Sequence, residues 1–268
     1  MTDVKGKTAL VTGGAMGMGK LLTERLLKAG AKVVIWDLNE EKLNEAREEL
    51  ASYGEVFSYS LDITDKDKVY ETADKVKKEV GRIDILVNNA GIVKGGPFLE
   101  LSDEDHRRTM EVNIMSLFWV TKAFLPEMMD RNEGHVVNIA SAAGLTGVPG
   151  ASSYSASKFA VVGWTDSIRL EAKKMGKKKV RFTTVCPSFV ATGMFDGIKP
   201  PFFAPMLTTE EMVNKTMKGI TRNKLLVMAP LIVNSVPLMK GLNVPFVTDF
   251  IGGVLGFHHS MDTWQGRK

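Results

Sequence analysis

A short apolar run, a cluster of glycines and a helical pattern follow one another at the start of the chain. The run covers 7–12 (KTALVT), the glycines fall within 13–19, and a helix is expected over 20–29. The alternation continues with strand-like runs at 31–36, 56–61, 83–87, 134–141, 180–186 and 225–228 and with helical patterns at 40–51, 65–80 and 209–221. Strands that alternate with helices form parallel sheets covered by helices on both faces. The sequence therefore predicts a single α/β domain over 1–268, built on a doubly wound parallel sheet.

The glycine cluster is the first candidate binding site. Gly13, Gly17 and Gly19 give the spacing G-x-x-x-G-x-G between a strand and a helix. Glycine lets the backbone turn tightly and approach a pyrophosphate, and the N-terminus of the next helix supplies free N–H groups and a positive dipole end. The turn therefore favours a dinucleotide as the ligand.

Asp37 follows the second expected strand. A carboxylate at this position accepts hydrogen bonds from both ribose hydroxyls of an adenosine and repels a 2′-phosphate. No Arg or Lys lies within 13–19 or immediately after Asp37. These features favour NAD over NADP as the cofactor. The alternative is that Asp37 caps the helix expected over 40–51.

Polar residues also follow the next two expected strands. Asp62 and Ile63 follow the third strand, and Asn88-Asn89-Ala90-Gly91 follows the fourth. Ligands of doubly wound sheets bind beyond the carboxyl ends of the strands, so these residues should lie on one edge with Gly13 and Asp37. Asp62 with Ile63 is placed to meet an adenine edge, although a surface turn explains Asp62 equally well.

Tyr154 and Lys158 are four residues apart on a helical segment, so their side chains leave the same helix face. An ammonium near a phenol favours the phenolate by Coulomb attraction. A tyrosine of ordinary pKa, about 10, would then exchange protons nearer neutrality, as a general acid/base for an alcohol or ketone must. The alternative is that an isolated pair at this spacing only decorates a helix.

Asn113 and Ser141 are two further candidates. Asn113 falls in the apolar stripe of a helix expected from Glu104 onward, and a buried amide must be hydrogen-bonded. It therefore either holds neighbouring strands together or helps to organise a site. Ser141 stands at the carboxyl end of the strand at 134–141, and a glycine-rich loop returns the chain from there to Tyr154.

Five motifs together resemble the short-chain dehydrogenase/reductase family, in the family's order and approximate spacing, over roughly residues 5–192. They are Thr12-Gly13-x-x-x-Gly17-x-Gly19, Asn88-Asn89-Ala90-Gly91, Asn113, Ser141 and Tyr154-x-x-x-Lys158. The resemblance implies a Rossmann fold. It also implies a homodimer or homotetramer, formed through the helices that bear Asn113 and Tyr154.

The resemblance further implies a catalytic tetrad of Asn113, Ser141, Tyr154 and Lys158. Tyr154 would take the hydroxyl proton of an alcohol while a hydride passes to C4 of the nicotinamide, and Ser141 would orient the substrate oxygen. Lys158 would lower the pKa of Tyr154 and hold the nicotinamide ribose. Asn113 would fix a water that relays protons from Lys158.

The segment 187–192 is similar to the family's Pro-Gly-x-x-x-Thr motif, in which the backbone and the threonine contact the nicotinamide carboxamide. Ser188 replaces the usual glycine, and the alternative for Thr192 is a helix cap. The residues expected to hold NAD are Thr12, Gly13, Met16, Gly17, Met18, Gly19, Asp37, Leu38, Asp62, Ile63, Asn89, Ala90, Gly91, Tyr154, Lys158, Pro187, Val190 and Thr192.

The segment 193–207 is apolar and aromatic, and three prolines break any regular structure in it. In the family this segment is the substrate lid, and the insertion with its following helix spans 193–222. We expect a substrate pocket lined by Ser141, Met194, Phe195, Phe202 and Phe203, to which Ile198 and Met206 also contribute. Contact with a neighbouring subunit is the competing interpretation of these apolar side chains.

The tail, residues 229–268, extends beyond the usual family core. Its run 244–257 is apolar enough to pack on the lid, on another subunit or at a membrane interface. With 118–126, the tail is similar to the subgroup that acts on hydroxysteroids, retinol and related lipids. His258 and His259 lack a partner pattern for a metal, and no metal site is predicted.

The composition narrows the compartment and the kinds of partner that the sequence allows. The single cysteine, Cys186, excludes a disulfide framework and favours a reducing compartment. The net charge is +4. The basic cluster 173–181 suits a solvated helix end better than an anionic surface, and it lacks the interleaved aromatics of a nucleic-acid site. No apolar signal segment opens the chain, and no run reaches the roughly 20 residues of a membrane span. We expect a cytoplasmic protein without a transmembrane span.

The sequence thus predicts an NAD(H)-dependent oxidoreductase that interconverts an alcohol with a ketone or aldehyde on an apolar substrate, which is steroid-, retinoid- or long-chain-like. One alternative is a 3-oxoacyl-thioester reductase, which would prefer NADPH, a preference that Asp37 opposes. The other is a non-catalytic nucleotide-binding regulator, against which the presence of all four tetrad residues speaks.

Overall fold

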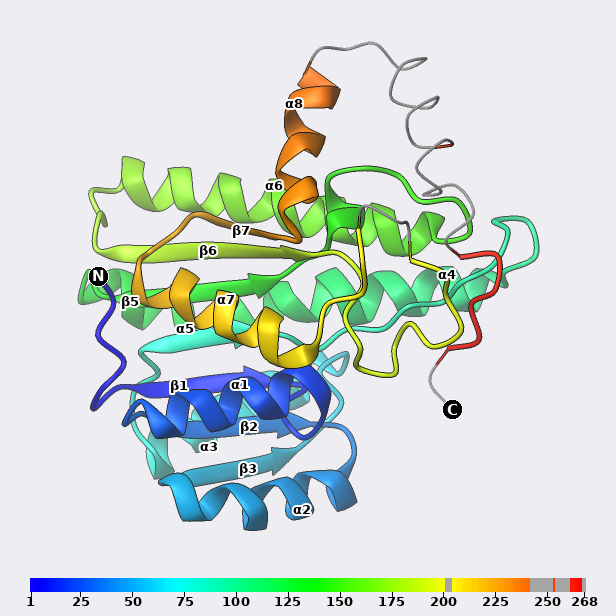
Figure 1. Cartoon of the computed structure of the whole chain (residues 1–268). Coiled ribbons are helices and arrows are strands. Elements are labelled where there is room, and N and C mark those ends of the chain that lie inside the picture. The colour runs from blue at the N-terminus through cyan, green and yellow to red at the C-terminus, as the bar shows by residue number, and fades with distance from the viewer. Residues whose placement is uncertain (201–203, 242–252, 254–260, 267–268) are drawn as a thin grey trace.

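The structure is a computed structural model that describes residues 1–200, 204–241, 253 and 261–266. Seven parallel strands form one sheet in the order β3-β2-β1-β4-β5-β6-β7 (Figure 1). The strands are β1 (Thr8–Thr12), β2 (Lys32–Asp37), β3 (Val56–Ser60), β4 (Ile85–Asn88), β5 (Gly134–Ile139), β6 (Val180–Pro187) and β7 (Leu226–Ala229). The predicted doubly wound parallel sheet is confirmed.

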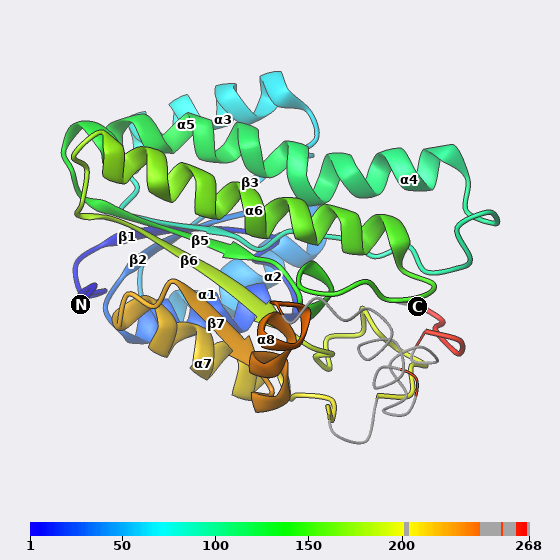
Figure 2. The same cartoon turned by 90° about the horizontal axis from the view of Figure 1, so that it is seen from above.

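Helices cover both faces of the sheet (Figure 2). One face carries α1 (Gly17–Lys28), α2 (Glu40–Leu50) and α7 (Thr209–Thr221), and the other carries α3 (Lys66–Glu79), α5 (Ser116–Asp130) and α6 (Ser152–Lys174). Two further α-helices of the described residues are α4 (Asp103–Met110), which runs into α5 through a π-helical turn at Glu111–Met115, and α8 (Ser235–Gly241). None of the helices in the described ranges combines the length and apolar character needed to cross a bilayer.

The central strands are buried on both faces of the sheet. The apolar sequence of β2 explains this burial. Val33, Val34, Ile35 and Trp36 are all 0% exposed. Val33 and Ile35 belong to the core beneath α1 and α2, whereas Val34 and Trp36 belong to the core beneath α3 and α5. Consecutive apolar residues are what a strand covered on both faces needs, because alternate side chains enter opposite cores.

The strands differ from the expected boundaries by one or two residues, and two helical regions depart further. α1 begins at Gly17 rather than at residue 20, because the glycine turn itself supplies the first helical residues. The helix expected from Glu104 onward is interrupted by the π-helical turn, which contains Asn113. A π-helical turn inserts an extra residue into the helical repeat and so redirects a side chain. Asn113 lies within this turn and is 2% exposed.

Buried amides tie the central strands to the helices. Asn88 at the end of β4 donates from Nδ2 to Asn138 Oδ1 on β5 at 2.8 Å and to Thr121 Oγ1 on α5 at 3.0 Å. Asn138 Nδ2 donates to Thr165 Oγ1 on α6 at 2.8 Å. Since Asn138 is 0% exposed, water cannot replace these bonds, and the network fixes α5 and α6 against the sheet.

We expect Asn138→Ala to lower the free energy of unfolding by about 1–3 kcal/mol, because it leaves a buried donor of Asn88 unpaired. Urea unfolding measures this change. The matched control is Asn44→Ala, at an exposed position on α2, which should change stability by less than about 0.5 kcal/mol. Equal midpoints for the two variants would show that the network adds nothing to stability.

Candidate active site

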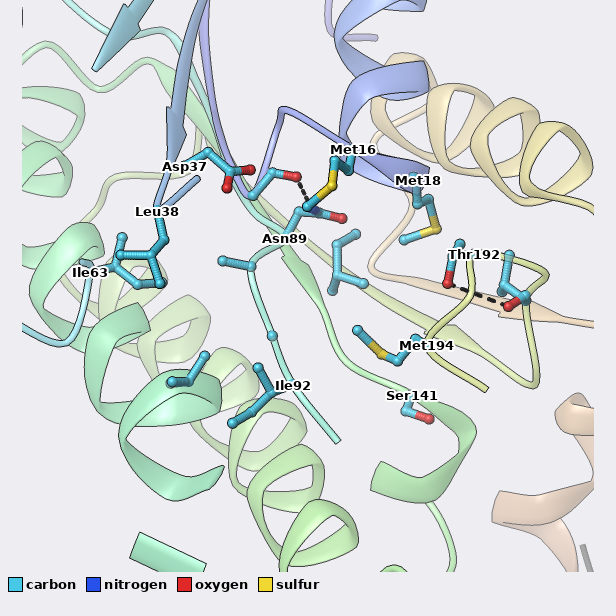
Figure 3. Close-up of a pocket in the computed structure, with 18 of the residues that line it drawn as sticks. Met16, Met18, Asp37, Leu38, Ile63, Asn89, Ile92, Ser141, Thr192 and Met194 are labelled. Atoms are coloured by element: carbon cyan, nitrogen blue, oxygen red, sulfur yellow. Dashed lines mark hydrogen bonds between the residues drawn. The ribbon is translucent and has the colours of Figure 1, made fainter. Parts of the chain in front are cut away.

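A cavity of about 610 Å³ opens at the carboxyl ends of the strands. Figure 3 shows Asp37, Leu38 and Ile63 at one end of it and Ser141 and Met194 at the other. The predicted site residues that line it are Gly13, Met16, Gly17, Met18, Gly19, Asp37, Leu38, Asp62, Ile63, Asn89, Ala90, Gly91, Ser141, Tyr154, Lys158, Pro187, Val190, Thr192, Met194 and Phe195. Thr12 and Asn113 do not line it, and Phe202 and Phe203 lie outside the described residues, as do His258 and His259.

The glycine turn is shaped for a close ligand. Gly13 has φ +62°, which favours glycine, and its N–H donates to Trp36 O at 2.7 Å. A Cβ on Gly19 would lie 2.1 Å from Gly13 O, so no side chain fits there. Met16 precedes α1 in extended conformation and provides no side-chain cap. The first N–H groups of α1 are therefore left for an anion such as a pyrophosphate.

Thr12 and Asn89 hold this turn against β4. Thr12 Oγ1 accepts from the backbone N–H groups of Asn89 at 3.0 Å and Ala90 at 3.1 Å. In return, Asn89 Nδ2 donates to Thr12 O and Gly13 O, both at 3.0 Å. Thr12 thus contributes to the site by positioning the backbone of Asn89 and Ala90. Asn89 both positions the glycine turn and lines the cavity.

Asp37 accepts hydrogen bonds from the loop residues around it. Its Oδ2 accepts from Ala15 N at 3.0 Å and its Oδ1 from Asn39 N at 3.2 Å. The alternative that Asp37 caps α2 is wrong, because Asn39 is the N-cap and accepts from Lys42 N. The carboxylate is thereby fixed at the edge of the cavity.

Asp62 is neutralised by a cation that the sequence interpretation missed. Its Oδ2 pairs with Arg108 on α4 at 2.9 Å, and its Oδ1 accepts from Thr64 N at 2.9 Å. Burial opposes ionisation, but the hydrogen bonds from Thr64 and the guanidinium of Arg108 outweigh it and lower the pKa of Asp62. Asp62 therefore serves as a turn residue and as part of the cavity wall together.

Tyr154, Lys158 and Ser141 meet at the other end of the cavity. They are 5%, 4% and 7% exposed. Lys158 Nζ lies 5.6 Å from the centre of the Tyr154 ring and donates to Ile139 O at 3.0 Å. Ser141 caps a short 3₁₀ turn at Ala142–Gly144 by accepting from Ala143 N. The helix face of α6 and the end of β5 thus bring a phenol, an ammonium and a hydroxyl together.

Burial controls the proton affinities of this group. It raises the pKa of Tyr154 to about 12, against the smaller opposite effect of a hydrogen bond with Ser141. Burial also lowers the pKa of Lys158 to about 8. The expected lowering of the Tyr154 pKa by Lys158 is therefore not seen in the polypeptide alone, since desolvation of the phenolate is the largest effect on this pKa. At neutral pH Tyr154 is a proton donor.

Asn113 does not line the cavity, but it connects the segments that do. Its Oδ1 accepts from Ile92 N at 2.8 Å, and its Nδ2 donates to Ile92 O at 2.9 Å and to Ser157 Oγ at 3.0 Å. A Cβ on Gly91 would lie 3.1 Å from Asn113 Oδ1 and 3.4 Å from Lys158 Nζ. Of the two interpretations left open by the sequence, the structure supports the second, because Asn113 joins the loop after β4 to α6.

The chain after β6 forms the remaining wall. Ser188, which replaces the family's glycine, donates its N–H to Ala229 O at 2.7 Å and lines the cavity. Thr192 caps no helix, because α7 begins later and is capped by Thr208. Phe195 packs edge-on against Tyr154 at 6.1 Å between ring centres.

The described parts of the lid divide into different environments. Met194 and Phe195 line the cavity, whereas Ile198 is buried in a neighbouring apolar cluster at 8% exposed. Met206 does not line the cavity and is 36% exposed. The sequence interpretation placed all of these in one substrate pocket, so it was too broad at Met206.

The lining residues missed from the sequence fall into two groups. Trp36, Asn39, Leu61, Ile92, Ile139, Ala140 and Ser188 line the cavity beside predicted residues in the chain. Arg108 and Val112 come from α4 and the π-helical turn. The carboxylate of Asp62 was the only available signal for Arg108, because a partly buried acid favours a nearby cation.

These features are those of an oxidoreductase with a dinucleotide site: a parallel-sheet crevice with a glycine turn and a carboxylate toward one end and a buried tyrosine, lysine and serine at the other. The model of the family described as short chain dehydrogenase matches residues 7–201. The chain belongs to this family.

Curated relatives cover most of the chain. A bovine (Bos taurus) protein named short-chain dehydrogenase/reductase family 16C member 6 is 44% identical over 85% of this chain and 73% of its own length. Mouse (Mus musculus) epidermal retinol dehydrogenase 2 is 39% identical over 99% of this chain and 87% of its own. Human (Homo sapiens) retinol dehydrogenase 10 is 37% identical over 91% of this chain and 80% of its own length. The similarity to the retinol dehydrogenase-like subgroup is thereby confirmed.

Solved structures share the fold. A short-chain dehydrogenase/reductase from Burkholderia phymatum, in complex with NAD, has a TM-score of 0.80 and 28% identity and covers 88% of this chain and 93% of its own. A short-chain dehydrogenase from Novosphingobium aromaticivorans has a TM-score of 0.78 and 26% identity, with 92% and 88% covered.

Gly19→Ala should weaken NADH binding by at least about a hundredfold, or about 2.8 kcal/mol. The added Cβ would displace Gly13 O and Asn89 Nδ2 from the turn. Fluorescence titration of NADH measures the dissociation constant. The control is Gly147→Ala, since a Cβ on Gly147 would meet no atom of the described residues within 4 Å. A wild-type dissociation constant for Gly19→Ala would remove the turn from the cofactor site.

Proposed function

We propose that this chain is an NAD-dependent dehydrogenase that oxidises an apolar, retinoid-like alcohol to its carbonyl compound and catalyses the reverse reaction. The observation that carries the proposal is the meeting of Ser141, Tyr154 and Lys158 at one end of a cavity whose other end holds Asp37. An acid/base group and a dinucleotide ribose acceptor in a single cavity serve hydride transfer to or from an alcohol carbon.

The residues of the cavity fit NAD. The turn at 13–19 would hold the pyrophosphate, Asp37 the adenosine ribose, and Lys158 with 187–192 the nicotinamide end. Among the described residues that line the cavity, the cations are Arg108 and Lys158. Arg108 is paired with Asp62, and Lys158 lies at the end of the cavity opposite Asp37. Neither cation is therefore placed to bind a 2′-phosphate beside Asp37. The NAD complex of the Burkholderia relative also supports this choice.

Each tetrad residue has a separate task. When bound, NAD supplies the hydride acceptor that the polypeptide lacks. Tyr154 takes the proton of the alcohol, or returns it to the carbonyl oxygen in reduction, and Ser141 donates to the same oxygen and orients it. Lys158 favours the phenolate by its charge whenever the proton leaves. Asn113 is a positioning residue that fixes Ile92 and Ser157.

The substrate class follows from the apolar side of the cavity and from the relatives. Met194 and Phe195 line the cavity, and Phe195 packs with Phe189 at 5.4 Å between ring centres. Relatives of 37–39% identity are named retinol dehydrogenases. A retinoid presents an alcohol at the end of an apolar chain, and such a molecule suits this wall. Hydroxysteroids and long-chain alcohols are the neighbouring candidates.

The deciding experiment follows absorbance in the NADH band with NAD and then NADP over retinol, long-chain alcohols, hydroxysteroids and 3-hydroxyacyl thioesters. We expect turnover with NAD on the apolar alcohols. Tyr154→Phe should lose about 10²–10⁴ in rate while it still binds NADH, and Tyr53→Phe, at a residue 44% exposed, should not change it.

Two other outcomes of this experiment would replace the proposal. Turnover only with NADP on thioesters would identify a 3-oxoacyl-thioester reductase. NAD binding without any turnover would favour the nucleotide-binding regulator.

The rate of oxidation should depend on pH, and the rate of reduction should not. Oxidation needs deprotonated Tyr154, whose pKa is raised to about 12, so log kcat/KM should climb by about one per pH unit between about pH 6 and 8. Reduction uses the protonated phenol, which is the main form throughout that range. Above about pH 8 Lys158 loses its charge, and the climb should level off. Initial rates in both directions test this, and a flat oxidation profile would contradict it.

Compartment and assembly remain predictions from the sequence. The single cysteine, Cys186, is fully buried, and burial raises the pKa of its thiol to about 12. An unreactive, buried thiol fits a reducing, cytoplasmic compartment. A homodimer or homotetramer remains the expected assembly, formed through the helical segment that bears Asn113 and through α6, which bears Tyr154.

A further inference from the structure

The segment 261–266 returns to the active site from the far end of the sequence. In Figures 1 and 2 it lies beside the lid, which follows β6, and near the loop between β4 and α4. Met261 is 7% exposed. The segment does not line the main cavity, so the cofactor site does not explain its burial.

Hydrogen bonds from one side chain and one backbone N–H join this segment to the lid. Trp264 Nε1 donates to Met194 O at 3.2 Å, and Gln265 N donates to Asp196 O at 3.0 Å. A Cβ on Gly197 would lie 2.6 Å from Thr263 O. Met194 also lines the main cavity. Trp264 is therefore hydrogen-bonded to the lid at a residue that faces the proposed substrate site.

The indole of Trp264 also packs on the loop after β4. A Cβ on Gly95 would lie 2.8 Å from Cδ2 and Cε3 of the indole and 2.9 Å from Met261 Cε. The flat ring therefore rests on the backbone of Gly95, where any side chain would push it away. The segment thus bridges the lid and the loop after β4.

Met261 lies near Tyr154, the proposed acid/base group. It packs in one apolar cluster with Tyr154, Phe189 and Ile198, against which Phe195 also packs. A hollow of about 40 Å³ lies between Met261 and the pair Ser141 and Tyr154. It shares Ser141, Tyr154, Ser188 and Phe195 with the main cavity, so it continues the site on the side of the substrate.

The size of this hollow limits what fits beyond the reacting carbon. Its volume of about 40 Å³ is a small fraction of the 610 Å³ of the main cavity. A bulky apolar group can enter only if the Met261 side chain moves, and an unbranched thioether adapts its shape more easily than a branched residue. Met261 is therefore placed to set the size of the group accepted there.

We infer that Met261 is a specificity-determining residue, the end wall of the substrate pocket, and that Trp264 is the positioning residue that fixes this wall to the lid and to the loop after β4. This inference rests on the proposed function, because it concerns the apolar alcohol of that reaction. The ligand class is an alcohol with an extended apolar group, whose far end meets Met261.

The experiment compares kcat/KM over a series of apolar alcohols of increasing size, at saturating NAD. Met261→Ala should raise the ratio of large to small alcohols by about tenfold or more, because removing several heavy atoms enlarges the hollow. Met261→Leu, which conserves volume, should leave the ratio within about threefold. Met175→Ala, at a methionine 64% exposed, controls for methionine loss elsewhere.

The contact between the Trp264 indole and Gly95 is tested by changing each residue in turn. Trp264→Ala removes the indole, and Gly95→Ala crowds it. Both should raise KM for large alcohols several-fold while the dissociation constant of NADH stays unchanged, and Gly147→Ala again serves as the control. Trp264→Phe keeps the packing and should retain most of the wild-type KM. A structural defect alone would instead change NADH binding and the small alcohols equally.

Binding measured by calorimetry with NADH present separates the two proposals. If wild-type protein binds the alcohols without turnover, the proposed function fails, and the binding constants of the Met261 variants still decide the inference. An unchanged size ratio in folded Met261→Ala, in turnover or in binding, would falsify the inference. If wild-type protein binds no apolar alcohol, both proposals are overturned.

Discussion

The hydrogen bonds exchanged between Thr12 and Asn89 are the constraint on which the site depends. They join the ends of β1 and β4, the neighbouring strands from which the order of the sheet runs in opposite directions. A crevice opens at such a point because successive crossovers leave on opposite sides. One hydroxyl serves two backbone N–H groups, and one amide serves two carbonyls. The glycine turn after β1 and the loop that leads from β4 towards Asn113 are both held by these hydrogen bonds.

Burial, rather than charge attraction, governs the chemistry at the other end. The phenol of Tyr154 and the ammonium of Lys158 are both nearly inaccessible, and each resists its charged form, so their pKa values move to about 12 and about 8. The order of the two groups is thereby the reverse of the usual one, in which the ammonium is the weaker acid. The folded protein thus holds a proton on Tyr154 at neutral pH, and a cation lies beside it only while Lys158 stays protonated.

Particular residues show how far sequence reasoning reached. Asp37 was placed from its position after an apolar run, and the structure also removed its alternative, because Asn39 caps α2 instead. Arg108 was missed, because its pairing with Asp62 joins positions far apart in the chain. The π-helical turn that carries Asn113 was missed as well, since the apolar stripe continues across it with helical spacing. Trp264 gave no local signal, because its partners, Met194 and Gly95, lie far away in the sequence.

The sequence by itself determined the doubly wound sheet, the glycine turn, the carboxylate after β2 and the pairing of Tyr154 with Lys158. These features depend on local spacing, on strand periodicity and on helix geometry, all of which can be read along the chain. Only the tertiary structure decided how deeply Tyr154 and Lys158 are buried, and so the direction of their pKa changes. It alone also brought Met261 and Trp264 against the lid, because desolvation and long-range packing depend on which distant segments meet, and no local pattern records that.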